Sequence, residues 1–162
     1  MKKENVKELY NSYVEDLRYI SEGQINKINL FYNHYNNDIL DAVDKKEKIC
    51  NIFITNIVNE DKKIEYENLW FFTQNYACEL HKFELEDYYD IAYFKNKIHF
   101  MEIKKENYFP ENNIRETNKE SRLFVEAHLA NGLNLTLKAS DVNCYYLYRI
   151  LKEILLPNVI IQ

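Results

Sequence analysis

Histidine is the side chain best suited to metal binding and proton transfer, and this 162-residue sequence scatters its four histidines. They are His34, His81, His99 and His128. A metal centre needs ligands that converge on one point, and no two histidines have the i, i+4 spacing of a shared helix face. Glu79 and His81 would share one face of a strand, but two ligands do not make a metal site. We therefore predict no metal and no cofactor.

The three cysteines, Cys50, Cys78 and Cys144, are widely spaced, and each lies in an apolar run. Because apolar surroundings raise the pKa of a thiol and make it inert, we expect reduced core thiols and not nucleophiles. Reduced thiols are typical of a reducing compartment. The start of the chain leads directly into a charged, amphipathic segment, unlike a signal peptide. We therefore expect a cytoplasmic protein.

Other signatures of catalysis are also missing. The sequence has no GxSxG motif, and its two isolated glycines cannot form a phosphate-binding loop. Glu84 and Glu86 could act as paired carboxylates, but they lie in an acidic run that we interpret as a solvated turn. We therefore expect no catalytic residues. An enzyme of unfamiliar type stays the alternative, and a titratable group with a shifted pKa inside a cleft would favour it.

Tyrosine is abundant, with 14 residues. Tyrosine is favoured at protein interfaces, but an AT-rich genome also enriches Tyr, Asn, Lys and Ile, and one sequence does not separate these explanations. Read as an interaction surface, the candidates are Tyr10, Tyr13, Tyr32, Tyr35, Tyr88, Tyr89 and Tyr93. The net charge of −5 speaks against a duplex nucleic acid partner. No run approaches the ~18 apolar residues of a membrane span.

Three segments have the spacing of amphipathic helices. In the first, apolar side chains recur at positions 6, 9, 10, 13, 17 and 20, and Gly23 follows where a helix can end. The second helix is predicted over 25–44. The third is predicted over 142–155, with Ser140 or Asp141 as its N-cap and Pro157 marking its end.

Between these helices the pattern changes to that of β-strands. Strands are predicted over 51–58, 68–74, 76–83, 88–94, 98–104, 122–129 and 133–137. The run 68–74 is apolar on both faces, which predicts a strand covered on both sides. Short turns between consecutive strands indicate antiparallel pairing, and Asn131-Gly132 is the strongest hairpin signal. The polar stretch 105–121 is predicted to be an exposed loop.

The run of strands followed by one helix resembles the pleckstrin-homology-like fold, including small bacterial families of that type, over roughly 51–155. The residues that carry the resemblance are those of 69–73, Tyr88–Ile91 leading into Lys97-Ile98, and the Asn131-Gly132 hairpin. The resemblance implies a half-open barrel or sandwich of two sheets, plugged by the last helix, and a binding or scaffold role. The basic loop of lipid-binding relatives has no counterpart, because the turn 74–76 carries no Lys or Arg.

We therefore expect one α+β domain over 1–162. A helical segment (1–48) precedes about seven antiparallel strands with a closing helix (49–156) and an apolar tail (157–162) that packs on the domain or on a second copy. The predicted function is a protein-binding, scaffold or inhibitor module without catalysis. The acidic balance suits an inhibitor that masks a basic target. A self-associating structural module is a further alternative.

Overall fold

The computed structural model describes residues 2–17, 21–45, 47–81, 90–95, 97–108, 117 and 120–160. Two helices come first, α1 (Lys2–Asp16) and α2 (Glu22–Asp44). The strands are β1 (Asn51–Val58), β2 (Ile64–Phe72), β3 (Tyr76–His81), β4 (Asp90–Lys95), β5 (Ile98–Glu106), β6 (Arg122–Leu129) and β7 (Asn134–Ser140). Helix α3 (Asn143–Ile150) continues as a π turn, η2 (Leu151–Leu155), and a 3-10 turn, η3 (Leu156–Asn158). The described residues thus confirm the expected α+β order.

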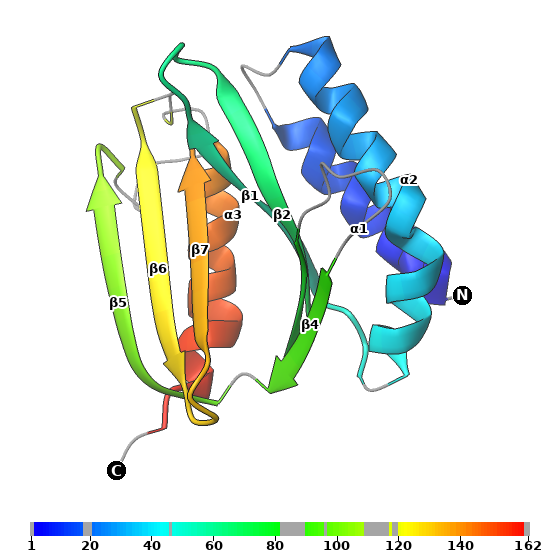
Figure 1. Ribbon diagram of the computed structural model, residues 1–162, viewed down its shortest axis with the longest axis vertical. Helices are drawn as coiled ribbons and strands as arrows, with labels where there is room; N and C mark the ends of the chain where they lie inside the picture. The colour runs from blue at the N-terminus through cyan, green and yellow to red at the C-terminus, as the bar shows by residue number, and fades with distance from the viewer. Residues whose placement is uncertain are drawn as a thin grey trace.

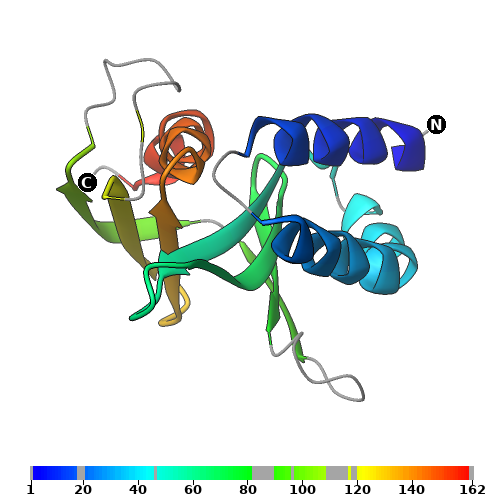
Figure 2. The same cartoon turned by 90° about the horizontal axis from the view of Figure 1, so that it is seen from above.

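The strands form two antiparallel sheets, β1-β2-β3-β4 and β5-β6-β7. The sheets meet where β1 lies beside β7, and they do not close into a barrel (Figure 1). Helix α3 packs on β1, β6 and β7, while α1 and α2 lie against β1 and β2 (Figure 2). The predicted Asn131-Gly132 turn joins β6 to β7, with Gly132 at a φ of +90° that glycine adopts without strain.

The middle of the four-stranded sheet is covered on both sides, as the apolar run in β2 predicted. Every residue from Leu69 to Phe72 is at most 1% exposed. The ring of Trp70 stacks on that of Phe72, with centroids 5.6 Å apart. These residues form the centre of the hydrophobic core.

Side chains replace backbone pairing at the seam between the two sheets. The Ser140 N–H donates to Asn56 Oδ1 at 2.7 Å, and Asn56 Nδ2 donates to the Ser140 carbonyl at 3.4 Å, which joins β7 to β1. Asn143 Nδ2 donates to the Ile54 carbonyl at 2.7 Å and to Asn56 Oδ1 at 3.0 Å. Buried polar groups need such partners, and Asn56 and Asn143 are at most 1% exposed.

Tyr13 extends this seam network into helix α1. Its hydroxyl donates to Asn143 Oδ1 at 2.6 Å and accepts from the Ile54 N–H at 3.2 Å. Burial, followed by the nearby Tyr66, raises the pKa of Tyr13 well above its usual value, so the hydroxyl keeps its proton. The network therefore attaches α1 to the seam between the two sheets.

The start of α3 differs from the sequence prediction. Ser140 is the last residue of β7, and Asp141 has a left-handed backbone with a φ of +57°. Neither is therefore the N-cap, which is Val142 in a helical conformation without a side-chain hydrogen bond. The reason is that the Ser140 backbone is held by Asn56, so the chain turns only after it. The apolar face of this helix, with Leu147 and Ile150, is buried as expected.

Other boundaries and exposures also need correction. Cys78 and Cys144 are buried, but Cys50 is exposed because it precedes β1 in a connection. Burial raises the pKa of Cys78 to about 12 and that of Cys144 further.

The polar loop that the sequence predicts over 105–121 is shorter than expected, because β5 extends to Glu106. Within the same stretch, Tyr108 and Thr117 are buried. Residues 82–89, with Glu84 and Glu86, and 109–116 lie outside the described residues.

Replacing Asn143 with alanine tests the seam network. We expect Asn143→Ala to lower the free energy of unfolding by about 2–4 kcal/mol, because it removes partners from the buried Ile54 carbonyl and Tyr13 hydroxyl. Urea unfolding followed by the fluorescence of buried Trp70 measures the change. Asn134→Ala, at an exposed site, is the matched control, with an expected loss below about 0.5 kcal/mol. Equal losses in both variants would contradict the role of Asn143.

Candidate functional site

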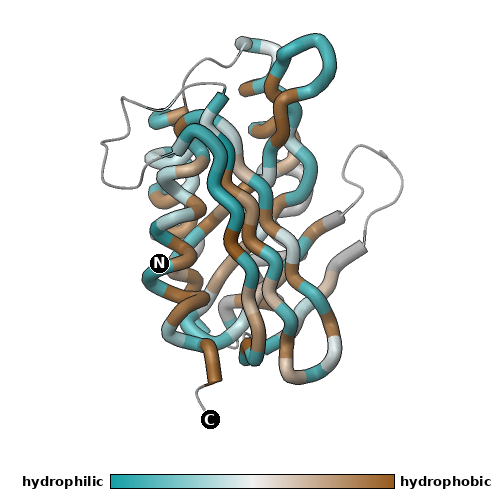
Figure 3. Tube along the Cα trace, turned by 90° about the vertical axis from the view of Figure 1, so that its left-hand side faces the viewer, coloured by the Kyte–Doolittle hydropathy of each residue, from teal (hydrophilic) through white to brown (hydrophobic). Residues whose placement is uncertain are grey.

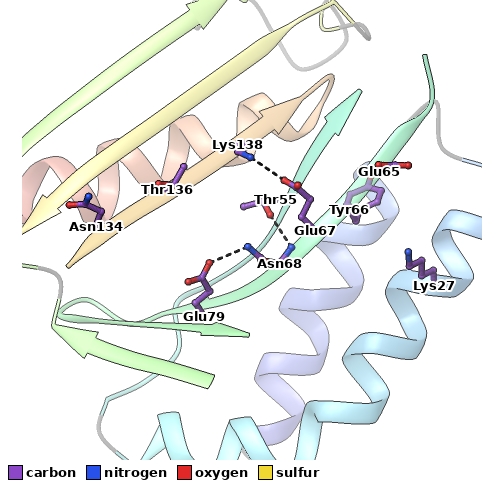
Figure 4. Close-up of a pocket in the computed structure, with 10 residues that line it drawn as sticks. All are labelled: Lys27, Thr55, Glu65, Tyr66, Glu67, Asn68, Glu79, Asn134, Thr136 and Lys138. Carbon is purple, nitrogen blue, oxygen red and sulfur yellow. Dashed lines mark hydrogen bonds and ion pairs between the residues drawn. The ribbon is translucent and has the colours of Figure 1, made fainter. Parts of the chain in front are cut away.

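A polar cleft of about 680 Å³ opens between β2 and β7 (Figure 4). Its lining residues come from α2, both sheets and the seam: Lys27, Thr55, Glu65, Tyr66, Glu67, Asn68, Glu79, Asn134, Thr136 and Lys138. They are contributed by parts of the chain that are far apart in sequence. Among the described residues of this lining there is no serine, cysteine or histidine, and its hydroxyl groups come from two threonines and a tyrosine.

A β-bulge in β2 creates the cleft wall. The register of β1 with β2 shifts between Ile54 and Asn56, so that Glu67 and Asn68 together face the single residue Thr55. Adjacent strand residues normally point to opposite faces, and a bulge redirects one of them. Both Glu67 and Asn68 therefore line the cleft. The Asn68 N–H donates to Thr55 Oγ1 at 2.9 Å, which compensates the disturbed pairing.

Glu79 is the residue of this cleft whose pKa is shifted into the neutral range. It lies on β3, opposite Trp70 in the ladder, and Asn68 Nδ2 donates to its Oε2 at 3.2 Å (Figure 4). Burial raises the pKa of Glu79 to about 7, and the Asn68 hydrogen bond offsets part of that rise. The carboxyl group therefore changes charge near neutral pH.

Charged side chains surround the opening of the cleft. Lys138 Nζ lies 3.6 Å from Glu67 Oε1 and so links β7 to β2 across the gap. Both side chains are more than a third exposed, and such ion pairs contribute at most about 1 kcal/mol. Lys27 of α2 is exposed, and its ammonium lies over the Phe31 ring, 5.6 Å from the centroid.

The edge strand β5 forms a second candidate surface. It pairs with β6 on one side. On its other side Val159 makes a parallel bridge with Ile98, and the Ile160 N–H donates to the Ile98 carbonyl at 2.7 Å. The tail thus packs on the beginning of β5 and leaves the rest of this edge without a strand neighbour among the described residues.

Exposed apolar side chains gather around this edge. Among the described residues, five of the six large apolar side chains that are exposed belong to β5, the β6–β7 turn, the first residue of η3 or the tail. They are Phe100, Ile103, Leu133, Leu156 and Ile160. Figure 3 shows this side of the molecule with the apolar tail at its lower end. The sixth, Leu30, lies on α2. Phe100 and Ile103 are three residues apart and point to opposite faces of β5, so this edge has exposed apolar side chains on both faces.

Three of the predicted interface tyrosines are instead core residues. Tyr10, Tyr13 and Tyr32 are at most 4% exposed. The rings of Tyr10 and Tyr32 stack between α1 and α2 with centroids 3.7 Å apart, and the Tyr10 hydroxyl donates to Asn29 Oδ1 at 2.7 Å. Their place in the apolar stripes explains this burial, because each stripe packs on a neighbouring element.

The remaining predicted tyrosines give no continuous surface in the described residues. Tyr93 is half-buried and stacks on Tyr76, with centroids 5.2 Å apart. Tyr88 and Tyr89, and the side chain of Tyr35, lie outside the described part of the chain.

The sequence pointed to Glu79 only because this residue would share one face of a strand with His81. It gave no sign of Lys138, because no local sequence pattern links β7 to β2.

No family model matches the chain, and no curated protein or solved structure matches it either. The pleckstrin-homology-like resemblance therefore stays a prediction. In the part of the chain that the structure describes, no group of three His, Cys, Asp or Glu residues could hold a metal ion. Within the same part, no helix combines the length and hydrophobicity that a membrane crossing requires.

Glu79 should make the stability of the protein depend on pH. The folded protein keeps the Glu79 proton up to a pH of about 7, whereas in the unfolded chain the pKa of Glu79 returns to its ordinary value of 4.5. Unfolding therefore releases a proton between these values, and the folded state loses stability as the pH rises through them. The Glu79→Gln variant has no such proton to release. Its free energy of unfolding, measured relative to that of the wild type, should therefore rise by about 1–3 kcal/mol as the pH increases from 4 to 8.

Urea unfolding at a series of pH values measures this difference. The control is Glu65→Gln, which changes an exposed carboxylate on the neighbouring strand. A wild-type stability that changes with pH in the same way as that of Glu79→Gln would show that Glu79 is not the responsible group.

Proposed function

We propose that this chain is a protein-binding module without catalysis, and that the edge of β5 takes up an extended apolar segment of a partner protein. One observation carries the proposal: the tail already forms a parallel bridge with Ile98 on this edge. The edge is thus competent to pair with a strand, and strand addition is a recurrent mode of peptide recognition. Backbone hydrogen bonds would supply affinity there.

The side chains along β5 define the chemistry of the partner. Phe100 and Ile103 are 50% and 42% exposed, which favours apolar partner side chains along the first part of the strand. Lys104 and Lys105 follow and are exposed, which favours an acidic residue at the far end. Lysines and a register shift such as that between Ile98 and Phe100 also discourage indiscriminate edge pairing. A selected partner suits this edge better than open-ended self-association.

Glu79 favours a second candidate function, acid–base catalysis in the cleft. A carboxyl group with a pKa of about 7 can donate or accept a proton near neutral pH. We rank it second because the described residues that line the cleft include no serine, cysteine or histidine to act with Glu79. A catalytic role would then rest on Glu79 with the other carboxylates, the tyrosine, the threonines and the lysines of the lining.

A library of linear random peptides, selected on the immobilised protein, tests strand addition. We expect selected peptides to bind at least about tenfold more weakly to Phe100→Lys and Ile103→Lys, because the charge disrupts apolar contacts at the edge. Fluorescence anisotropy measures the affinities. Leu30→Lys is the matched control, since Leu30 is 64% exposed on α2 and should leave binding unchanged.

Hydrogen exchange identifies the surface that is used. Bound peptide should slow the exchange of β5 backbone amides. The proposal fails if no peptide is selected, or if selected peptides bind the two β5 variants as tightly as the wild type. A dimer in light scattering that Phe100→Lys dissociates would assign the edge to a second copy of the chain and overturn the partner assignment.

A further inference from the structure

We propose that the cleft between β2 and β7 binds a guanidinium group, carried by an arginine side chain of a polypeptide or by a free small molecule. The cleft is lined by α2, β1, β2, β3 and β7, whereas the apolar edge is β5, at the far side of its sheet. This second site therefore does not depend on strand addition at β5.

The cleft offers acceptors on both walls. Glu79 and Asn68 lie on one side, and Asn134 and Thr136 lie on β7 across the opening (Figure 4). A guanidinium group is planar and carries five N–H donors in a fixed fork. It can therefore bond to several acceptors at once, and this cleft presents carboxylate, amide and hydroxyl oxygens from two walls.

The cleft has the charge that a cation requires once Glu79 is ionised. Three carboxylates, Glu65, Glu67 and Glu79, then line it together with two ammonium groups, which leaves one net negative charge. The Lys138 ammonium pairs with Glu67 across the gap between β7 and β2, and the Lys27 ammonium lies over the Phe31 ring. Because burial disfavours the ionised form of Glu79, a cation beside this carboxylate would stabilise it most. A basic ligand also matches the net charge of −5.

Guanidinium fits this position better than ammonium. Burying the Glu79 carboxylate costs free energy, which a cation that itself loses little hydration can offset. Guanidinium is more weakly hydrated than ammonium and stays protonated at all relevant pH values. A volume of about 680 Å³ also exceeds one guanidinium group, so an arginine within a peptide would fill the cleft more completely than a free small molecule.

Binding should depend on pH through Glu79. An ionised Glu79 attracts the guanidinium, so affinity should rise as the pH increases from 5 to 8. The other titratable groups that line the cleft are Lys27, Glu65, Tyr66, Glu67 and Lys138. Burial raises the pKa of Tyr66 above the range tested, so Tyr66 does not change charge there.

N-acetyl-argininamide is the test probe, and the neutral citrulline analogue of the same shape is its control. We expect the arginine probe to shift the NMR signals of the Asn68 side chain at pH 8 and the citrulline probe not to. Glu79→Gln should weaken binding at least about tenfold, because it removes the charge-assisted hydrogen bonds. The matched variant Glu102→Gln, at an exposed carboxylate on β5, should bind as the wild type does.

A second probe, an acetylated Gly-Arg-Gly peptide amide, distinguishes an arginine of a polypeptide from a free small molecule as the source of the guanidinium group. Tighter binding of this peptide than of N-acetyl-argininamide would support a polypeptide ligand, and equal binding would support a free small molecule. Equal binding of the citrulline and arginine probes, no binding of either, or an unchanged affinity in Glu79→Gln would overturn the proposal. Urea unfolding of Glu79→Gln at pH 8 shows whether lost binding could reflect unfolding. None of these outcomes affects the proposed role of β5.

Discussion

The seam between β1 and β7 is the constraint on which the rest of this structure depends. Two sheets meet there without a continuous backbone ladder, so polar backbone groups in the interior need other partners. Asn56 bonds both backbone groups of Ser140, while Tyr13 and Asn143 bond those of Ile54. These side chains come from α1, β1 and α3, so satisfying the seam also fixes how the helices sit on the sheets.

The same region of β1 shapes the opposite wall of the cleft. At Thr55 the pairing with β2 becomes irregular, and the bulge turns both Glu67 and Asn68 toward the cleft. On the other side of β1, the seam holds β7 in place, so that Lys138 lies within 3.6 Å of Glu67. A polar cleft thus follows from two departures from regular sheet pairing, one on each side of one strand.

The two candidate surfaces differ in the chemistry they would recognise. The edge of β5 offers backbone groups with exposed apolar side chains such as Phe100 and Ile103. The cleft offers a carboxylate whose burial raises its pKa to about 7. An extended partner segment would suit the first, and a basic group would suit the second. Because β5 and β7 are the opposite edges of the three-stranded sheet, the β5 edge and the cleft beside β7 would bind their ligands independently.

The sequence by itself determined the elements, because the spacing of apolar residues reflects which face of each element is buried. That periodicity predicted α1, the unbroken apolar run predicted the covered part of β2, and the turn chemistry of Asn131-Gly132 predicted the hairpin. It did not show what covers each face, so Tyr10 and Tyr32 read equally well as interface or core residues. Only the tertiary structure decided that they stack against each other. It alone also brought Glu79 and Lys138 to one cleft, because a bulge and a seam between distant strands leave no local pattern.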